Sequence, residues 1–482
     1  MTCRKKLVVV ALYLLAATAA AQGPGANAQR EFIKVDAPVV ALTHVRVVDG
    51  TGAAARDDQT LVIQGGRIAA LGPSASTAAP AGARILDLGG YTLLPGLVGM
   101  HDHMFFPLGG NPPHYANMAI SFPRLYLAAG VTTIRTAGSV QPYDDLEVKR
   151  LIDAGRMIGP KMHVTAPYLE GKGSFTPVMH ELTGPDDARR MVSYWADAGA
   201  TSFKAYMNIT HAELAAAVEE AHKRGLKVTG HLCSIGFKEA AEIGIDNLEH
   251  GWLVDTEFAP DKKPDQCAEA SARTERVSQD MNSAPVQDTI EKLVAKHVAI
   301  TSTLPVFEAS APSVPGGPRA QRPLLQERVL AVMDPGAQAR YLAARARVAP
   351  DSTSLTLLKK EMQFERDFVK AGGLLIAGLD PTGNGGTVAG FGDQREVELL
   401  VEAGFTPLEA IRIQTLNGAQ FLGEQERIGS LAVGKQADIV VVHGSPDQNV
   451  SDIEKVEIVF KDGVGWDSEK LIRSVQGTVG TR

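Results

Sequence analysis

The amino-acid sequence predicts an α/β fold, a (β/α)8 TIM-like barrel with a small β-sandwich domain formed by the N- and C-terminal segments. Three observations predict it. In the middle of the chain, eight short apolar segments alternate with helical segments, as the βα units of a parallel sheet do. Segments rich in β-branched residues and Gly or Pro turns flank this region on both sides. Polar residues that suit metal binding stand at the ends of several apolar segments.

Residues 1–21 are expected to be a secretory signal peptide. Three basic residues precede a 15-residue apolar stretch, from Leu7 to Ala21, that ends in small residues. A membrane-spanning helix needs about 20 apolar residues, so this stretch is short for an anchor. An uncleaved N-terminal anchor is the alternative. Cleavage predicts an exported protein, periplasmic or secreted, that keeps no membrane span.

Composition and charge narrow the class of protein. The chain has 482 residues, 44% hydrophobic and 21% charged, which describes a globular protein with one large core and a smaller one. The signal segment carries three basic residues and no acid, so its loss changes the formal net charge from −7 to −10. This charge argues against a nucleic-acid partner. Of the cysteines, Cys233 and Cys267 remain in the exported chain, where a disulfide is permitted and the sequence leaves its presence open.

The small domain is expected to combine residues 36–94 with residues 424–482. "ALTHVRVVDGTG", "DQTLVIQGGRIAALGP", "QADIVVVHGSP" and "VEIVFKDGVGW" alternate β-branched and polar residues between turn residues, as short antiparallel strands do. The two remote segments can complete one sheet, with the barrel of residues 95–423 inserted between them.

The eight barrel strands are expected within short apolar segments. They are "GLVGMHDH", "GVTTIRTAG", "KMHVTAPYL", "ATSFKAYM", "LKVTGHL", "DNLEHG", "VAITSTL" and "GLLIAGLD". Amphipathic stretches such as "HAELAAAVEEAHKRG" and "TSLTLLKKEMQFERDFVKAGG" connect them as helices. Two connections are long, residues 255–287 and residues 305–350, and are expected to be lids or flexible insertions at the active-site end.

Six polar residues in or at the ends of these strands predict a metal site. His101 and His103 are two residues apart, so on an extended strand both imidazoles point to the same side. An isolated H-x-H pair occurs by chance, and a histidine at a strand end is often only a hydrogen-bonded rim residue. Four imidazoles, a carboxylate and a lysine around one barrel end favour metal binding. The six are His101, His103, Lys204, His231, His250 and Asp380.

The order of these motifs resembles the amidohydrolase superfamily. "PGLVGMHDH", "SFKAYM", "TGHL", "LEHG" and "AGLD" look like its metal motifs. "TPLEAIRIQTLNGAQFLG" and "RIGSLAVGKQADIVVV" are similar to the branch that holds imidazolonepropionase-like enzymes and prolidase-type dipeptidases. The resemblance covers nearly the whole mature chain and says little about the substrate.

The resemblance implies a binuclear metal centre. His101, His103 and Asp380 would bind one divalent ion and His231 and His250 the second. Lys204, carboxylated by CO₂, would bridge them as a carbamate; an unmodified lysine that pairs with an acid is the alternative. Zn²⁺ is the default for these ligands, and manganese, cobalt and iron stay open. Two ions that share a water make hydroxide available near neutral pH, and Asp380 would move its proton to the leaving nitrogen.

Candidate substrate contacts are Tyr206 and Arg135. Tyr206 is two residues after Lys204 and can donate its hydroxyl to a substrate oxygen, or it is a stacked rim residue. Arg135 can pair with a substrate carboxylate, or it forms an internal ion pair. His163 is expected to be a structural core histidine.

The leading hypothesis is a hydrolase of amide-type C–N bonds that acts on small peptides or N-acyl amino acids. Cyclic amides such as imidazolones, lactones and phosphotriesters are alternative substrates, and an exported binding protein without catalysis is the alternative from another class. A nucleotide cofactor is not indicated, because the glycine-rich residues 383–386 lack a phosphate-binding context. Whether the chain forms a homo-oligomer stays open.

Overall fold

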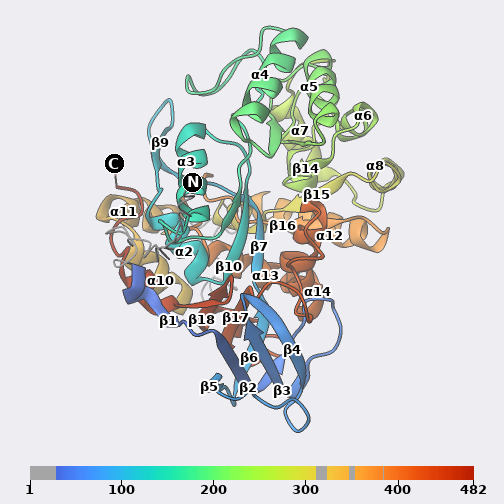
Figure 1. Ribbon diagram of the computed structural model, residues 1–482. Helices are drawn as coiled ribbons and strands as arrows, with labels where there is room; N and C mark the ends of the chain where they lie inside the picture. The colour runs from blue at the N-terminus through green and yellow to red at the C-terminus, as the bar shows by residue number, and fades with distance from the viewer. Residues whose placement is uncertain (1–28, 311–322, 347–352, 384, 482) are drawn as a thin grey trace, which may run out of the picture.

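The computed structural model describes residues 29–310, 323–346, 353–383 and 385–481 (Figure 1). The expected signal peptide lies outside the described residues. Within these ranges, none of the helices has both the length and the apolarity that crossing a membrane requires.

All eight predicted barrel segments contain a strand. These strands are β7 (Leu97–Asp102), β10 (Val131–Thr136), β11 (Lys161–His163), β12 (Ser202–Ala205), β13 (Lys227–Gly230), β14 (Asn247–Glu249), β15 (Ala299–Ser302) and β16 (Leu375–Ala377). They pair in parallel in two sheets, in the orders β11-β10-β7 and β12-β13-β14-β15-β16. The prediction of an α/β fold with parallel strands is confirmed.

Backbone contacts join the two sheets at both of their seams. On one side, Thr165 bridges Ser202 in parallel. On the other, the amide of Asp380 donates to the carbonyl of His101 at 3.0 Å. A Cβ atom at Gly378 would lie 2.2 Å from the backbone nitrogen of His101, so this close approach requires glycine. The paired strands do not form one continuous eight-stranded ladder in the described residues, so a closed barrel is not shown.

Helices follow the strands in the expected order, and most surround the parallel strands in Figure 1. The two stretches predicted to be helical form α5 (His211–Lys223) and α12 (Thr353–Lys370). Thr210 and Glu213 make a capping box at the start of α5, which satisfies two of the amide groups that lack a helical partner. Outside the two long connections, the barrel region also contains α2 (Ser121–Ala128), α3 (Pro142–Asp153), α4 (Pro185–Ala198), α6 (Phe237–Ile243), α13 (Phe391–Ala403), α14 (Pro407–Arg412) and α15 (Gly418–Leu422).

Both long connections contain helices, which the sequence prediction of loops missed. The first contains α7 (Glu269–Ser278) and the start of α8 (Ala284–Ala295). The second overlaps α9 (Leu304–Ser310) and contains α10 (Pro323–Val332) and α11 (Pro335–Ala346), while residues 311–322 and 347–352 lie outside the described residues. Two of its prolines begin helices, a position where the missing N–H removes no hydrogen bond, so a proline-rich composition did not exclude helix.

Cys233 and Cys267 form a disulfide. It ties the first long connection to the segment after β13, two residues beyond His231. The bridge that the sequence left open is therefore present.

The two ends of the chain build one mixed nine-stranded sheet, with the N-terminal strands beside β17 and β18 in Figure 1. Its strands are β1 (Ile33–Val35), β2 (Val39–Val47), β3 (Arg56–Gln64), β4 (Arg67–Pro73), β5 (Arg84–Asp87), β6 (Tyr91–Pro95), β17 (Ile439–His443), β18 (Val456–Lys461) and β19 (Val464–Asp467). Alternate residues enter two different cores: Leu93 and Ile439 join the small domain's cluster, and Leu94 and Val440 join the large one. The predicted single sheet from both termini is confirmed, and the domain boundaries at residues 95 and 424 stay predictions.

Candidate metal centre

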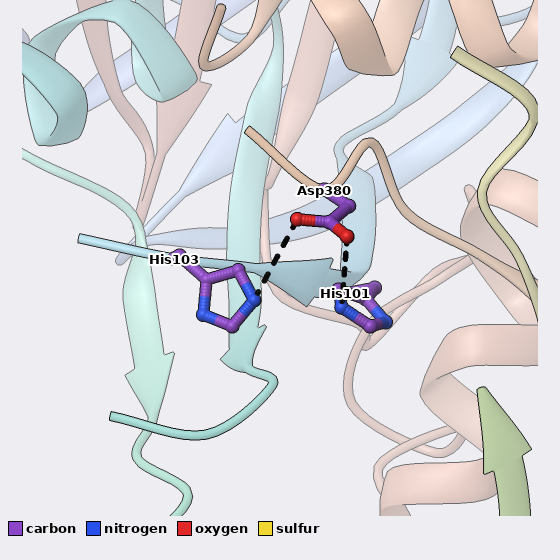
Figure 2. Close-up of side chains that lie close together, drawn as sticks. All are labelled: His101, His103 and Asp380. Carbon is purple, nitrogen blue, oxygen red and sulfur yellow. Dashed lines mark ion pairs between the residues drawn. The ribbon is translucent and has the colours of Figure 1, made fainter. Parts of the chain in front are cut away.

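His101, His103 and Asp380 come together at the carboxyl ends of the first and last parallel strands (Figure 2). The Nε2 atom of His101 lies 3.7 Å from Oδ2 of Asp380, and Nε2 of His103 lies 3.8 Å from Oδ1. All three side chains are buried. One ligand atom from each falls within 4.8 Å of the others, which is a spacing that a single metal ion can bridge.

Lys204 lies against this group. Its Nζ atom is 3.3 Å from Nε2 of His101, and the side chain is buried. Burial lowers the pKa of Lys204 to about 8, although Glu249 and Asp380 act in the opposite direction. A share of the amine is therefore neutral near physiological pH.

His250 and His231 complete the cluster. The Nε2 atom of His250 lies 3.9 Å from Oδ2 of Asp380, and its ring centroid is 4.4 Å from that of His101. The ring of His231 lies 4.6 Å from the ring of His250. All six predicted ligand residues thus meet in one place, which we call the metal cluster: His101, His103, Lys204, His231, His250 and Asp380.

Hydrogen bonds to Nδ1 orient three of the imidazoles. The Nδ1 atom of His101 lies 2.7 Å from Glu249, that of His103 lies 3.0 Å from the carbonyl of Gly138, and that of His250 lies 2.8 Å from Thr303. In each case Nε2 is left for a metal ion. Burial and neighbouring cationic groups keep the pKa of each cluster histidine low, about 3 for His231, so the rings are neutral and offer a lone pair. This donor set fits divalent metal ions.

Two members of the cluster have left-handed backbone conformations. The φ angle is +69° at His250 and +47° at Asp380, values that residues other than glycine rarely adopt. Thr382 holds Asp380 in place, because its amide and its hydroxyl donate to Oδ1 at 3.0 and 2.7 Å. Such strained residues concentrate at functional sites, which fits the position of both.

Glu249 contacts the cluster and was not among the site residues predicted from the sequence. One of its oxygens contacts His101 and the other accepts from Arg135 at 2.7 Å, with both side chains buried. Burial alone would raise the pKa of Glu249, but Arg135 and Lys204 keep it below its ordinary value. An acid directly before the strand-end His250, in "NLEHG", was the available signal.

Arg135 makes the internal ion pair that was the alternative to a substrate contact. Besides Glu249, it donates to the carbonyl of Met100 at 2.8 Å and to the side chain of Asn247 at 3.2 Å. Its guanidinium supports His101 through Glu249.

Tyr206 lies beside the cluster, and His163 lies away from it. The ring of Tyr206 is 5.0 Å from the ring of His231. His163 is partly buried, and its Nε2 atom lies 3.3 Å from Glu424. It pairs with an acid outside the metal cluster.

The amidohydrolase family model matches residues 92–262 and 343–464, which is more than half of the chain. The chain belongs to the amidohydrolase family. The matched segments contain all six residues of the metal cluster. Membership confirms the family predicted from the strand-end motifs, and it makes the chain a metal-dependent hydrolase by class.

Sequence similarity to a curated relative is local. The chain is 36% identical to the imidazolonepropionase of Arthrobacter sp. (strain FB24) over 118 residues, which is 24% of this chain. The match spans 27% of that relative's length.

Solved amidohydrolases share the fold over most of the chain. A putative prolidase from Bifidobacterium longum is 24% identical with a TM-score of 0.64, over 91% of this chain and 98% of that one. A Xaa-Pro dipeptidase with bound methionine is 19% identical with a TM-score of 0.64, over 89% and 100% of the two chains. The ochratoxinase of A. niger is 19% identical with a TM-score of 0.62, over 89% and 96%. At these identities the likeness concerns the fold alone.

Proposed function

We propose that this amidohydrolase is an exported enzyme that uses two divalent metal ions to cleave amide-type C–N bonds in small peptides or N-acyl amino acids. The observation that carries the proposal is the buried metal cluster of four neutral imidazoles, one carboxylate and a lysine of lowered pKa. His101, His103 and Asp380 would hold one ion, His231 and His250 the other, and Lys204 would bridge them as a carbamate. Zn²⁺ suits this donor set.

The fold and the location belong to the same proposal. We take the two parallel sheets as halves of one (β/α)8 barrel beside a β-sandwich, supported by the backbone contacts at both seams and by the solved relatives. The Cys233–Cys267 disulfide supports export, because such bonds persist in oxidising compartments.

Formation of the carbamate needs a neutral amine. The lone pair of Nζ adds to the carbon of CO₂, and the nitrogen then gives a proton to solvent water, which leaves an anionic N-carboxylate. The low pKa of Lys204 supports this step, since the amine need not give up a strongly held proton first.

When bound, the two ions supply Lewis-acid activation of the attacking water and of the scissile carbonyl. Asp380 accepts the proton of that water and delivers it to the leaving nitrogen. Burial raises the pKa of Asp380, which favours a carboxyl group that can hold the proton between the two steps. Glu249 and Thr303 keep His101 and His250 oriented throughout.

Metal analysis tests the centre. Purified protein should contain close to two divalent ions per chain, and His231→Ala should lose one of them together with hydrolysis. His163→Ala is the matched control, because His163 lies outside the cluster, and it should keep both. Full activity in a metal-free preparation would refute the proposal.

A substrate screen tests the reaction. Dipeptides and N-acyl amino acids should turn over faster than lactones and phosphotriesters; the reverse order would overturn the amide assignment. Cyclic amides are the second candidate, favoured by the local similarity to imidazolonepropionase, and they belong in the same screen.

A further inference from the structure

His250 is oriented by residues at the start of α9. Its amide donates to the carbonyl of Thr301 at 2.9 Å, which fixes the backbone and leaves the ring to other contacts. The Nδ1 atom lies 2.8 Å from the hydroxyl of Thr303, and the ring of Phe307 meets the imidazole edge-on at 5.8 Å between centroids. Thr303 immediately precedes α9, and Phe307 lies on it. The orientation of this imidazole therefore depends on where α9 lies.

The helix α9 is too short to fix its own position. It has seven residues, whereas isolated helices shorter than about 12–15 residues are marginal in water. It packs against α12 and α13. Contacts with these neighbours must therefore determine its place.

A bidentate ion pair connects α9 to α13. Arg395 on α13 donates from Nε to Oε2 of Glu308 at 3.1 Å and from Nη2 to Oε1 at 2.7 Å. The two side chains are only 5% and 12% exposed, so solvent screens the pair weakly. Two parallel hydrogen bonds fix direction as well as distance. Glu308 is the residue after Phe307, so this pair acts on the part of α9 that contacts His250.

The same guanidinium has two acidic partners on its own helix. Its Nη1 atom donates to Glu398 at 2.9 Å and to Glu402 at 2.8 Å. Burial alone would lower the pKa of Arg395, but Glu308 and Glu402 raise it well above its ordinary value, so the group stays charged. Arg395 is therefore held firmly on α13, and its contact with Glu308 extends this fixed position to α9.

We propose that Arg395 is a positioning residue for the metal centre. Through Glu308 it places α9, and α9 places Thr303 and Phe307 against His250. Arg395 thereby controls the affinity for the ion that His231 and His250 are proposed to bind, which we call the second ion. This inference rests on the proposed function and adds a residue outside the metal cluster to it.

The effect should be selective for the second ion. His250 has a φ angle of +69°, a conformation that only its surroundings can maintain. His101 and His103 are oriented by Glu249 and the carbonyl of Gly138, which lie outside α9. Contacts that orient a metal ligand directly change metal affinity by about 10- to 100-fold, and Arg395 acts one layer further out. We therefore expect a loss of about three- to tenfold for the second ion and none for the first.

The test compares two acids that contact the same arginine. Glu308→Gln breaks the bidentate pair while Glu398 and Glu402 keep the buried charge of Arg395 paired. Glu402→Gln is the matched control, because it removes a contact of similar length within α13. Titration with chelator-buffered Zn²⁺ should show weaker binding of the second ion in Glu308→Gln and unchanged binding of both ions in Glu402→Gln. Equal weakening of both ions by Glu308→Gln, or of neither, would overturn the inference, as would an equal effect of Glu402→Gln.

A double-mutant cycle tests the route. Arg395→Gln should weaken the second ion as much as Glu308→Gln does, and the double variant should lose no more than either single variant, because all three remove one contact. Losses that add would refute a common route. If Arg395→Gln does not fold, the comparison of Glu308→Gln with Glu402→Gln decides alone.

Metal-free protein separates this inference from the proposed function. If the wild type binds fewer than two ions, the two-metal proposal fails, and deuterium exchange at the C2 atom of the histidine rings tests the positioning by itself. Glu308→Gln should speed exchange at His250 and leave His163 unchanged, and Glu402→Gln should change neither. An unchanged rate at His250 in Glu308→Gln would then refute the inference.

Discussion

The Nζ atom of Lys204 lies 3.3 Å from the Nε2 atom of His101, the same ring nitrogen that faces Asp380. A full ammonium there would repel a metal ion at the same nitrogen. Burial moves the pKa of Lys204 down to about 8, so the amine loses its proton more readily than an exposed lysine does. The lysine is therefore placed to be either a neutral amine or, after reaction with CO₂, an anion.

The first prediction concerns the carbamate. Lys204→Ala should lose most hydrolysis and part of the metal, because two dications need an anionic bridge between them. Propionate should restore part of both by entering the vacated position, and bicarbonate should speed metal reconstitution of the wild type. Metal content and turnover are measured together.

Lys227→Ala supplies the control, since Lys227 lies at the start of β13, over Phe421 and away from the cluster. It should behave as the wild type does. Two metals and normal turnover in Lys204→Ala would remove the carbamate from the mechanism and favour a one-metal centre.

A second prediction concerns the Arg135–Glu249–His101 chain of contacts. Glu249→Gln should lower the affinity of the first ion by about 10- to 100-fold, because the ring of His101 loses a charged acceptor at Nδ1. Titration with a chelator-buffered metal measures this. Glu249→Gln alone leaves the buried charge of Arg135 unpaired. The double variant Arg135→Met, Glu249→Gln removes that charge, so it should be more stable than the single variant while its metal affinity stays low. If Glu249→Gln bound the first ion as tightly as the wild type does, the contact between Glu249 and His101 would not contribute to metal binding.

The third prediction concerns pH. Glu170 joins two loops beside the cluster, because one of its oxygens accepts from the amides of Gly171 and Asn208 at 2.8 and 2.7 Å. Burial raises its pKa to about 7. The folded protein therefore holds the proton more tightly than the unfolded chain does, and stability falls as pH rises from about 4.5 to 7.

Glu170→Gln keeps the acceptor oxygen and removes this loss. It should be neutral near pH 4.5 and stabilising by about 1–3 kcal/mol above pH 7. Urea unfolding at both pH values measures the difference. If Glu170→Gln raised the free energy of unfolding equally at both pH values, the ionisation of Glu170 would not be the cause.

The fourth prediction concerns the disulfide. Cys233 and Cys267 are 34 residues apart, so the bond should contribute about 3–4 kcal/mol by restricting the unfolded chain. Cys267→Ser should unfold at a lower denaturant concentration than the wild type does, and adding a reductant should not change its unfolding midpoint. The same reductant should lower the midpoint of the wild type toward that of the variant. Because Cys233 is two residues from His231, the Cys267→Ser variant and the reduced wild type should also bind the second ion more weakly. Unchanged unfolding of the wild type under reductant would argue against a stabilising role.

Much of the centre could be predicted because its residues lie at strand ends. Parallel strands bring their carboxyl ends to one side, so His101, Lys204, His231 and Asp380 had to meet once the strands were located. The apolar segments that mark these strands are short and bounded by turns, which makes them visible in a single sequence.

The supporting contacts could not be predicted in the same way. Glu249 points at His101 and Arg135 from strands that are far apart in the chain, and no local pattern encodes that meeting. The helices α10 and α11 lie in a connection that was expected to be a lid or flexible insertion because of its length, and Pro323 and Pro335 begin them.

The nine-stranded sheet of the small domain has a consequence for biosynthesis. β17 lies between β18 and β6, and β1 pairs with β19, so strands from the end of the chain complete a sheet begun at its start. A nascent chain that ends before residue 439 leaves the edges of β1 and β6 without partners, and an open strand edge invites aggregation. Folding of this sheet therefore finishes only after the last strands have been synthesised, because no earlier segment can take their places beside β1 and β6.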